Sequence, residues 1–207
     1  MSIVTYNNRS IANISAVPGA AKSLTHIKTL TASSSATLTF LNGSSDVVFD
    51  STYPIYKFVY TSMHPSTQRV FSFQATTDGT NYNTSITSTA FGAYHAESGG
   101  DDSGDNNFPA AGANTGSDQA NGTAFQYLMS FGSNISDNDS AFSGELIMFN
   151  PSSTTFVKHW MSDLNFYGGS NYSQRSQHAG YFNTTSAITG VQFKMLDDGN
   201  IDSGTIK

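Results

Sequence analysis

From Leu24 onward the sequence is a succession of short runs in which apolar and polar residues alternate, and turn-forming residues separate the runs. A period of two places successive side chains on opposite faces of a β-strand, whereas an amphipathic helix needs apolar residues three and four positions apart. No stretch carries a sustained apolar stripe of the helical kind. The pattern therefore predicts an all-β fold with very little helix.

The alternation also predicts which side chains face the core. Tyr56, Phe58 and Tyr60 share one side of the run 55–61, and Phe71 and Phe73 share one side of the run 69–75. The clearest hairpin joins 142–149 to 155–164 through a turn at 150–153 with the sequence Asn-Pro-Ser-Ser. In addition to these runs, we expect strands at 24–31, 36–40, around 82–87, 125–131, 173–183, 187–196 and 203–207.

Many short strands in one chain predict two packed antiparallel sheets, that is, an antiparallel β-sandwich with jelly-roll-like connections. At 207 residues the chain fits one such domain plus a short arm. We expect an extended N-terminal arm at 1–22, where no periodicity is sustained, and a single sandwich domain at 23–207. A long Gly-, Asp- and Asn-rich loop at 97–123 interrupts the strands, and loops of that length are usually functional, interface elements or disordered.

Composition excludes several classes of protein. Cysteine is absent, which rules out disulfides, thiolate metal sites and cysteine nucleophiles. Only 12% of the residues are charged, the formal net charge is −6 and lysines and arginines form no cluster, so nucleic-acid binding is not expected. The start of the sequence has no signal-peptide pattern, and no stretch approaches the roughly 18 to 20 apolar residues that cross a bilayer. We therefore expect no membrane association and synthesis in a cytoplasm.

The sequence offers little for catalysis or for metal binding. It has no Gly-x-Ser-x-Gly elbow for a serine nucleophile, no His-Glu-x-x-His motif, and only two glutamates. Acidic residues gather at 101–105 and 197–202, where they could serve either as Ca²⁺ ligands or as ordinary turn residues that bond their own backbone. Neither stretch has the order of an EF-hand loop, which favours turns. We expect no enzymatic activity, no metal and no cofactor.

Aromatic side chains are the better candidates for a binding site, because their apolar faces stack on sugar rings while their polar tips form hydrogen bonds. Tyr167 and Tyr172 flank the flexible sequence Gly-Gly-Ser-Asn, and Trp160 is the single tryptophan of the chain. These three residues are the candidates for carbohydrate binding, although most aromatic residues at strand spacing belong to a core.

Ten segments distributed along nearly the whole chain resemble small structural proteins of tailed bacteriophages, especially phages of marine bacteria. The segments are 6–10 (Tyr-Asn-Asn-Arg-Ser), 31–36, 50–53, 64–65, 77–83 (Thr-Asp-Gly-Thr-Asn-Tyr-Asn), 122–124, 150–159 (Asn-Pro-Ser-Ser-Thr-Thr-Phe-Val-Lys-His), 179–183, 191–195 and 204–207. The resemblance implies a non-enzymatic virion component, displayed on the head or as a short fibre on the tail. It implies no catalytic residues. Similar chains usually continue for a few apolar residues after Gly-Thr-Ile-Lys, so we expect this sequence to be part of a slightly longer protein.

The resemblance leads to two functional hypotheses. In the first, the protein decorates the capsid or forms a short fibre at the virion surface, and Tyr6, Asn7, Asn8 and Arg9 in the arm anchor it to the major capsid or tail protein. In the second, it is a receptor-binding tail-fibre protein that recognises carbohydrate on the host surface. We expect a homo-oligomer in either case, most simply a trimer, because assembly would cover the exposed strand edges of a sandwich.

Overall fold

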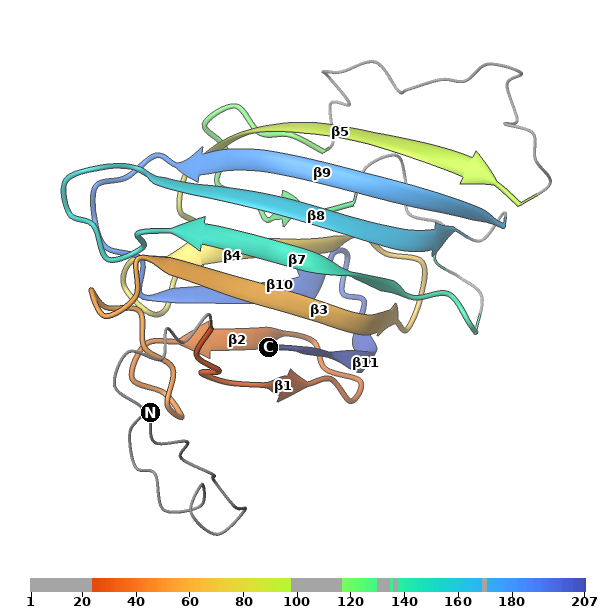
Figure 1. Cartoon of the computed structure of the whole chain (residues 1–207), viewed down its shortest axis with the longest axis horizontal. Coiled ribbons are helices and arrows are strands. Elements are labelled where there is room, and N and C mark those ends of the chain that lie inside the picture. The colour runs from red at the N-terminus through yellow and green to blue at the C-terminus, as the bar shows by residue number, and fades with distance from the viewer. Residues whose placement is uncertain (1–23, 98–116, 130–134, 136–137, 169–170) are drawn as a thin grey trace, which may run out of the picture.

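Two antiparallel β-sheets packed face to face make up the protein (Figure 1). The structure is a computed structural model that describes residues 24–97, 117–129, 135, 138–168 and 171–207. Within these residues all regular secondary structure is β-strand, and no helix has the length and apolar character that a membrane span requires. The predicted all-β class and the predicted antiparallel sandwich are therefore confirmed.

The larger sheet has seven strands in the order β1-β11-β3-β7-β8-β9-β5. Its central strands are long and follow one another as antiparallel neighbours, so that each residue of β8 has a partner on β9, and residues 160–166 also have partners on β7. The bounds are Leu30–Thr31 (β1), Ile55–Pro65 (β3), Ile86–Ala96 (β5), Phe142–Phe149 (β7), Lys158–Gly168 (β8), Tyr172–Phe182 (β9) and Ile201–Ile206 (β11).

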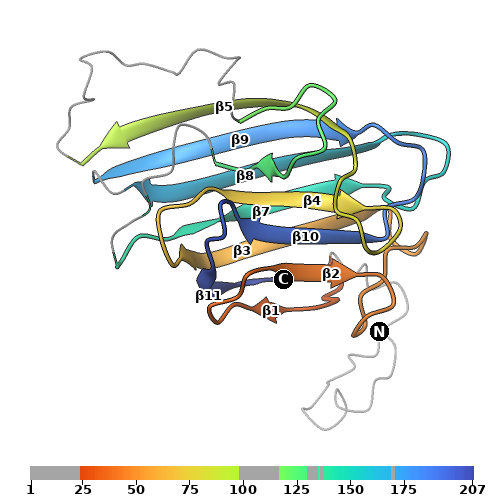
Figure 2. The same ribbon diagram turned by 180° about the vertical axis from the view of Figure 1, so that it is seen from behind.

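The smaller sheet has four strands in the order β2-β10-β4-β6 and lies behind the larger one, as Figure 2 shows from the opposite side. Its bounds are Leu38–Leu41 (β2), Phe71–Thr76 (β4), Gln126–Tyr127 (β6) and Gly190–Met195 (β10). Every strand pair in both sheets is antiparallel. This order is compatible with the expected jelly-roll-like connections, without establishing them.

The core between the sheets is dominated by aromatic rings. Phe193 of β10 lies at its centre, and the ring of Phe71 stacks on it with centroids 5.7 Å apart and planes at 8°. Aromatic pairs in stacked or edge-on arrangements contribute beyond simple burial of apolar area, about 0.5–1.5 kcal/mol per pair. Four further rings surround Phe193 at centroid distances of 5.4–6.3 Å, namely Phe40, Phe58, Tyr60 and Phe73.

The predicted strand positions are right for most of the chain, and the predicted inward-facing residues are buried. Tyr56, Phe58, Tyr60, Phe71 and Phe73 are all at most 5% exposed. Two of the predicted strands are much shorter than expected: 24–31 has only Leu30–Thr31 in a strand, and 125–131 has only Gln126–Tyr127 within its described part. The strand expected around 82–87 instead begins at Ile86 and runs to Ala96.

Strand β4 is buried on both faces, which the alternation of its sequence does not predict. Phe71 and Phe73 face the core, while Ser72 and Gln74 point the other way and are also fully buried. The Gln74 amide donates hydrogen bonds to the carbonyl oxygens of Thr123 and Ala124, at 3.1 and 2.9 Å. The segment before β6 therefore covers the far side of β4 and satisfies its polar groups.

Candidate functional site

The surface of the larger sheet that faces away from the smaller one, called the outer face here, is made by alternate residues of its long strands. The pairing register places five of them in one row across β5, β9, β8, β7 and β3. These are Phe91, Gln177, Asp163, Glu145 and Val59. Because side chains on neighbouring strands lie about 4.5–5.5 Å apart at their β-carbons, the row forms a continuous strip.

Charged groups on the outer face are paired with one another. Glu145 binds the ammonium of Lys57 at 2.5 Å. Asp163 accepts two hydrogen bonds from the Arg175 guanidinium, and Gln177 Nε2 donates a third at 3.1 Å. The hydrogen bonds from Arg175 lower the pKa of the Asp163 carboxyl, and Gln177 adds to the effect. The outer face is therefore nearly neutral, with planar donors and acceptors held in fixed positions.

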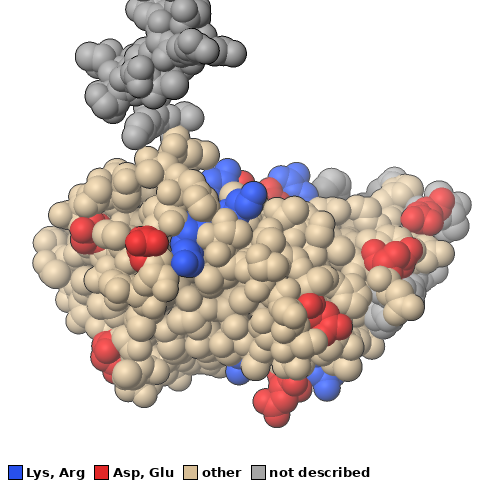
Figure 3. All heavy atoms as spheres, turned by 90° about the horizontal axis from the view of Figure 1, so that it is seen from below, with Lys and Arg blue, Asp and Glu red and all other residues tan. Residues whose placement is uncertain are grey.

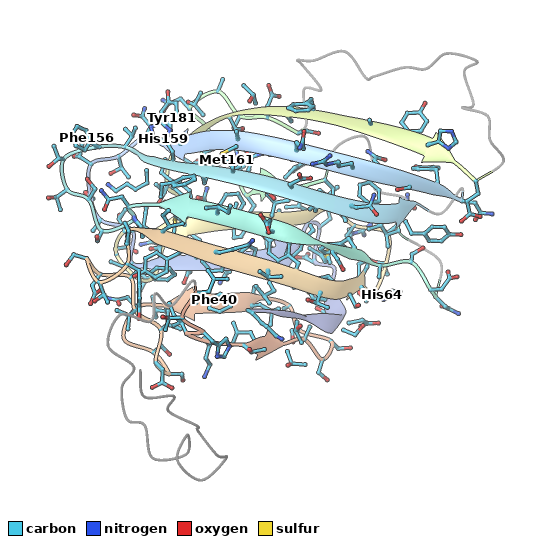
Figure 4. All side chains as sticks on the ribbon, viewed as in Figure 1. Phe40, His64, Phe156, His159, Met161 and Tyr181 are labelled. Carbon is cyan, nitrogen blue, oxygen red and sulfur yellow. The ribbon has the colours of Figure 1, made fainter. Side chains whose placement is uncertain are left out.

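Large apolar side chains are also exposed on this side of the molecule. Phe91 is 52% exposed, Met161 55%, and Phe156, in the connection before β8, 69%. His159 and Tyr181 are cross-strand neighbours whose ring centroids lie 6.0 Å apart. Figure 4 shows Phe156, His159, Tyr181 and Met161 at the same end of the sheet. Exposed apolar groups gathered on a folded protein indicate an interaction surface.

The three residues predicted to bind carbohydrate do not form one site. Trp160 is 1% exposed and packs edge-on against Phe73 in the core, so its proposed role at the surface is corrected. Tyr167 and Tyr172 flank the same hairpin but lie on opposite faces of the sheet, because the pair Gly168–Tyr172 sets the register. Tyr167 donates to Asn171 Oδ1 at 2.7 Å, while the ring of Tyr172 packs against Tyr94.

The residues predicted to anchor the protein, Tyr6, Asn7, Asn8 and Arg9, lie outside the described residues, as does the whole arm at 1–22. The same holds for positions 98–116 of the loop predicted at 97–123. The described end of that loop is ordered by hydrogen bonds: Gln119 N donates to Ser88 Oγ at 2.9 Å, and Gly122 forms a bridge with Ile86.

The acidic stretch at 197–202 folds as a turn that leads into β11. Asp197 and Asp198 have φ angles of 51° and 60°, in the left-handed region that Asp and Asn tolerate in turns. Asp202 accepts a hydrogen bond from Ser34 Oγ at 2.9 Å and lines a polar hollow of about 460 Å³ that also includes His64. No group of three His, Asp or Glu residues that could hold a metal ion is found in the part of the chain that the structure describes.

Polar groups are also buried between the sheets beneath β8 and β9. Lys158 is fully buried, and its ammonium donates to the carbonyl oxygens of Thr184 and Ser186 at 3.1 and 2.6 Å. His178 is 3% exposed, and neither ring nitrogen has a hydrogen-bond partner within the described residues. Desolvation lowers the pKa of Lys158 and brings that of His178 to about 4. These groups lie inside the fold.

Phe91 and its neighbours on the outer face were not predicted from the sequence. The predicted strand stopped at residue 87, although the alternation continues through Thr87, Thr89, Phe91, Ala93 and His95. The continued alternation beyond residue 87 was the sequence signal that could have extended the predicted strand. The partners Asp163, Arg175 and Gln177 come from strands that were predicted, but their proximity depends on a register that no local pattern contains.

Comparisons with family models, with curated proteins and with solved structures give no match for this chain.

Proposed function

We propose that this chain is a non-enzymatic structural protein of a tailed-phage particle, displayed at the virion surface on the capsid or as a short fibre. The assignment to a phage particle rests on the sequence resemblance. The observation that carries the structural role is the outer face, a broad strand surface with paired charges and exposed Phe91 and Met161. Phe156, in the connection before β8, adds a further exposed ring beside it. Such a surface suits contact with other proteins or with neutral ligands.

The distribution of polar groups supports a structural role. The buried Lys158 and Gln74 form hydrogen bonds with backbone carbonyls that order the connections between strands. Buried polar groups that are satisfied in this way help to specify one fold. In this proposal the homo-oligomer, most simply a trimer, would cover part of the outer face or a sheet edge.

Immunolabelling of purified virions tests the proposal. An antibody against this protein, imaged by electron microscopy, is expected to decorate the head if the protein covers the capsid, and the tail if it is a short fibre. Deleting residues 1–22 is expected to abolish incorporation, because the arm is the proposed anchor. Intact particles that contain none of the protein would refute the virion assignment.

A second candidate function is recognition of a neutral host carbohydrate. The observation that favours it is the position of Phe91 on β5 beside Gln177, which is bonded to the Asp163–Arg175 pair. A half-exposed ring next to fixed hydrogen-bonding groups can stack on the apolar face of a sugar while its hydroxyls are bonded. A purified protein lacking residues 1–22 should then keep its binding to a glycan array, whereas a protein that acts only through its arm should show none.

A further inference from the structure

The outer face carries a continuous group of apolar side chains at the end where β3 begins. Met161 of β8 lies at its centre, with Ile147 of β7 and Ala179 of β9 as its cross-strand neighbours. Two positions further along β7, Phe149 pairs with Ile55 of β3. Because alternate side chains share one face of a strand, all five point away from the core. We call these five residues the apolar patch.

The apolar patch and the two rings beside it expose a large area for a single chain. Of the five large hydrophobic side chains that are exposed within the described residues, Ile55 and Met161 belong to the patch, and Phe91 and Phe156 lie beside it. Each of these four is more than half exposed, which amounts to roughly 500 Å² together. The largest apolar patch on a typical monomer is about 300–600 Å² and often marks an interface.

The outer face also has the dimensions of one side of a stable protein–protein interface. The strands β3, β7, β8, β9 and β5 are eight to eleven residues long. At the usual rise per residue and strand spacing they form a surface of roughly 800 Å². A specific interface buries about 800 Å² on each partner. Two such faces can pack as the two sheets of a sandwich do, about 10 Å apart.

The charges on the outer face favour a partner whose face is neutral as well. Apart from the buried Lys158, the charged residues of these five strands are Lys57, Glu145, Asp163 and Arg175, which form two ion pairs. The formal charge of the outer face is therefore zero, and the net charge of −6 lies on the rest of the chain. Figure 3 shows that most of the side seen from below is likewise neither acidic nor basic. Two copies can therefore meet at their outer faces without like-charge repulsion across the contact.

The rows of the outer face are complementary to themselves across β8. In the row of Met161, β7 presents the bulky Ile147 and β9 presents the small Ala179. A twofold axis along β8 places β7 of one copy over β9 of the other, so that Ile147 occupies the space above Ala179 in both halves. Two positions further along both strands, the same axis places Phe149 over Tyr181, which allows one ring to pack on another.

We propose that a second copy of this chain covers the outer face, and that the twofold axis of the pair passes over Met161. The proposal rests on the role of the outer face as a contact surface in the function proposed above, and it names the partner. A face that meets its own copy makes a pair, because this contact is closed by a twofold axis. A trimer would have to use a sheet edge. The pair would also cover Phe91, so a carbohydrate at that ring and the second copy would exclude each other.

Other occupants fit the apolar patch less well. A carbohydrate needs hydrogen-bonding groups, which the side chains of Ile55, Ile147 and Phe149 lack. Residues 98–116 contain three aspartates and only one large apolar residue, a phenylalanine. A continuation of β11 past Lys207 would lie beside β3 in the plane of the sheet, because Lys207 forms backbone hydrogen bonds with Val59. Residues 1–23 do contain several apolar side chains, and the labelling experiment below separates their cover from that by a second copy.

Sedimentation equilibrium of the full chain is the first test. The expected mass at micromolar concentration is twice the 22.1 kDa of one chain. Met161→Glu places two carboxylates opposite each other at the axis and should weaken the pair at least about tenfold. Ser44→Glu, in an exposed turn outside the outer face, is the matched control and should keep the wild-type mass; thermal unfolding checks that both variants fold. A monomer, or any oligomer whose mass Met161→Glu leaves unchanged, would overturn the proposal.

Cross-linking tests the position of the axis. The chain has no cysteine, so Met161→Cys introduces a single thiol. A short bis-maleimide should join two copies of this variant and should not join copies of Ser44→Cys. Rapid modification of Met161→Cys by a monofunctional maleimide, without cross-linking, would mean that nothing covers the residue. Slow modification in a monomer would mean that the chain's own residues cover it, and either result would overturn the proposal.

The pairing and the virion role can fail separately. Virions that carry the immunolabel, together with a free protein that is monomeric, would refute the pairing and leave the virion role standing. A dimer that Met161→Glu dissociates, together with particles that contain none of the protein, would support the pairing and refute the virion role.

Discussion

The indole of Trp160 lies directly over Gly180, its cross-strand neighbour on β9. A β-carbon on Gly180 would come within 2.7 Å of Trp160 Cζ2 and within 2.6 Å of the carbonyl oxygen of Thr87 on β5. The largest side chain of the core therefore rests on a position where the sheet has no side chain. This contact connects β8, β9 and β5, the three strands that carry most of the outer face.

Replacing Gly180 by alanine is expected to destabilise the fold. The added methyl group must displace either the buried indole or the backbone of β5, and overpacking of this kind typically costs about 1–3 kcal/mol. Urea denaturation followed by far-UV circular dichroism measures the change. Ala179→Ser, at the adjacent position of β9 that faces outward, is the control and should leave stability nearly unchanged.

A double-mutant cycle locates the cause of that loss. In a Trp160→Phe background the smaller ring leaves more space above Gly180, so Gly180→Ala should cost less than it does with tryptophan present. Equal costs in the two backgrounds would show that the contacts with Thr87 and Ser88 on β5 determine the effect.

Acid should weaken the fold through His178. Its burial holds its pKa at about 4, below the ordinary value of 6.5, so the unfolded chain takes up the proton first as the pH falls. The neutral His178 contributes fully to the free energy of unfolding above pH 6.5, and this contribution is lost as the pH falls from 6.5 to 4. Between pH 7 and pH 5 this amounts to about 2 kcal/mol.

Urea titrations at several pH values measure this dependence. His178→Leu keeps a comparable volume without a titrating group, and its stability should vary less over the same pH range than that of the wild type. Ala179→Ser, on the outer face, adds no titrating group and should keep the wild-type slope. A slope that is the same in all three proteins would mean that His178 is not the titrating group.

Lys158 is expected to stabilise the connection between β9 and β10. Its ammonium is fully buried and binds the carbonyl oxygens of Thr184 and Ser186, which Lys158→Met would leave without a donor. The expected loss is about 2 kcal/mol in the free energy of unfolding. Lys194→Met, which removes an ammonium 4.4 Å from the centre of the Phe125 ring on the smaller sheet, should cost less. A smaller loss at Lys158 than at Lys194 would contradict this assignment.

The alternation of the sequence predicted the sandwich because each core strand follows it closely, as Tyr56, Phe58 and Tyr60 do in β3. It failed in two places for physical reasons. Around Gln74, a neighbouring segment covers the second face of a strand, and such coverage depends on tertiary contacts. Around Trp160, the sequence shows an aromatic residue at strand spacing but not which face of the strand it occupies.

The same limitation applies to the surface sites. Tyr167 and Tyr172 are close in sequence, yet a hairpin register turns them to opposite faces of the sheet. Phe91 and Asp163 are far apart in sequence, yet three neighbouring strands bring them into one row. Strand content follows from local pattern, whereas a binding surface on a sheet follows from strand order and register.

Removing the Phe91 ring tests the outer face as a carbohydrate site. The ring is about half exposed, so Phe91→Ala should change stability by less than about 1 kcal/mol, which thermal unfolding can check. If the row beside Gln177 binds a neutral sugar, the substitution should remove most of the signal on a glycan array, because stacking on the ring supplies much of the contact.

Phe156→Ala is the matched control for that substitution, because Phe156 is even more exposed but precedes β8 at the end of the sheet near His159 and Tyr181. Loss of glycan signal in Phe91→Ala alone would place the site at the row through Gln177 and Asp163. Loss in Phe156→Ala alone would move it to the end of the sheet. If both variants lose incorporation into virions and neither protein binds glycans, the exposed rings belong to a protein contact, because a sugar site would have no reason to affect assembly.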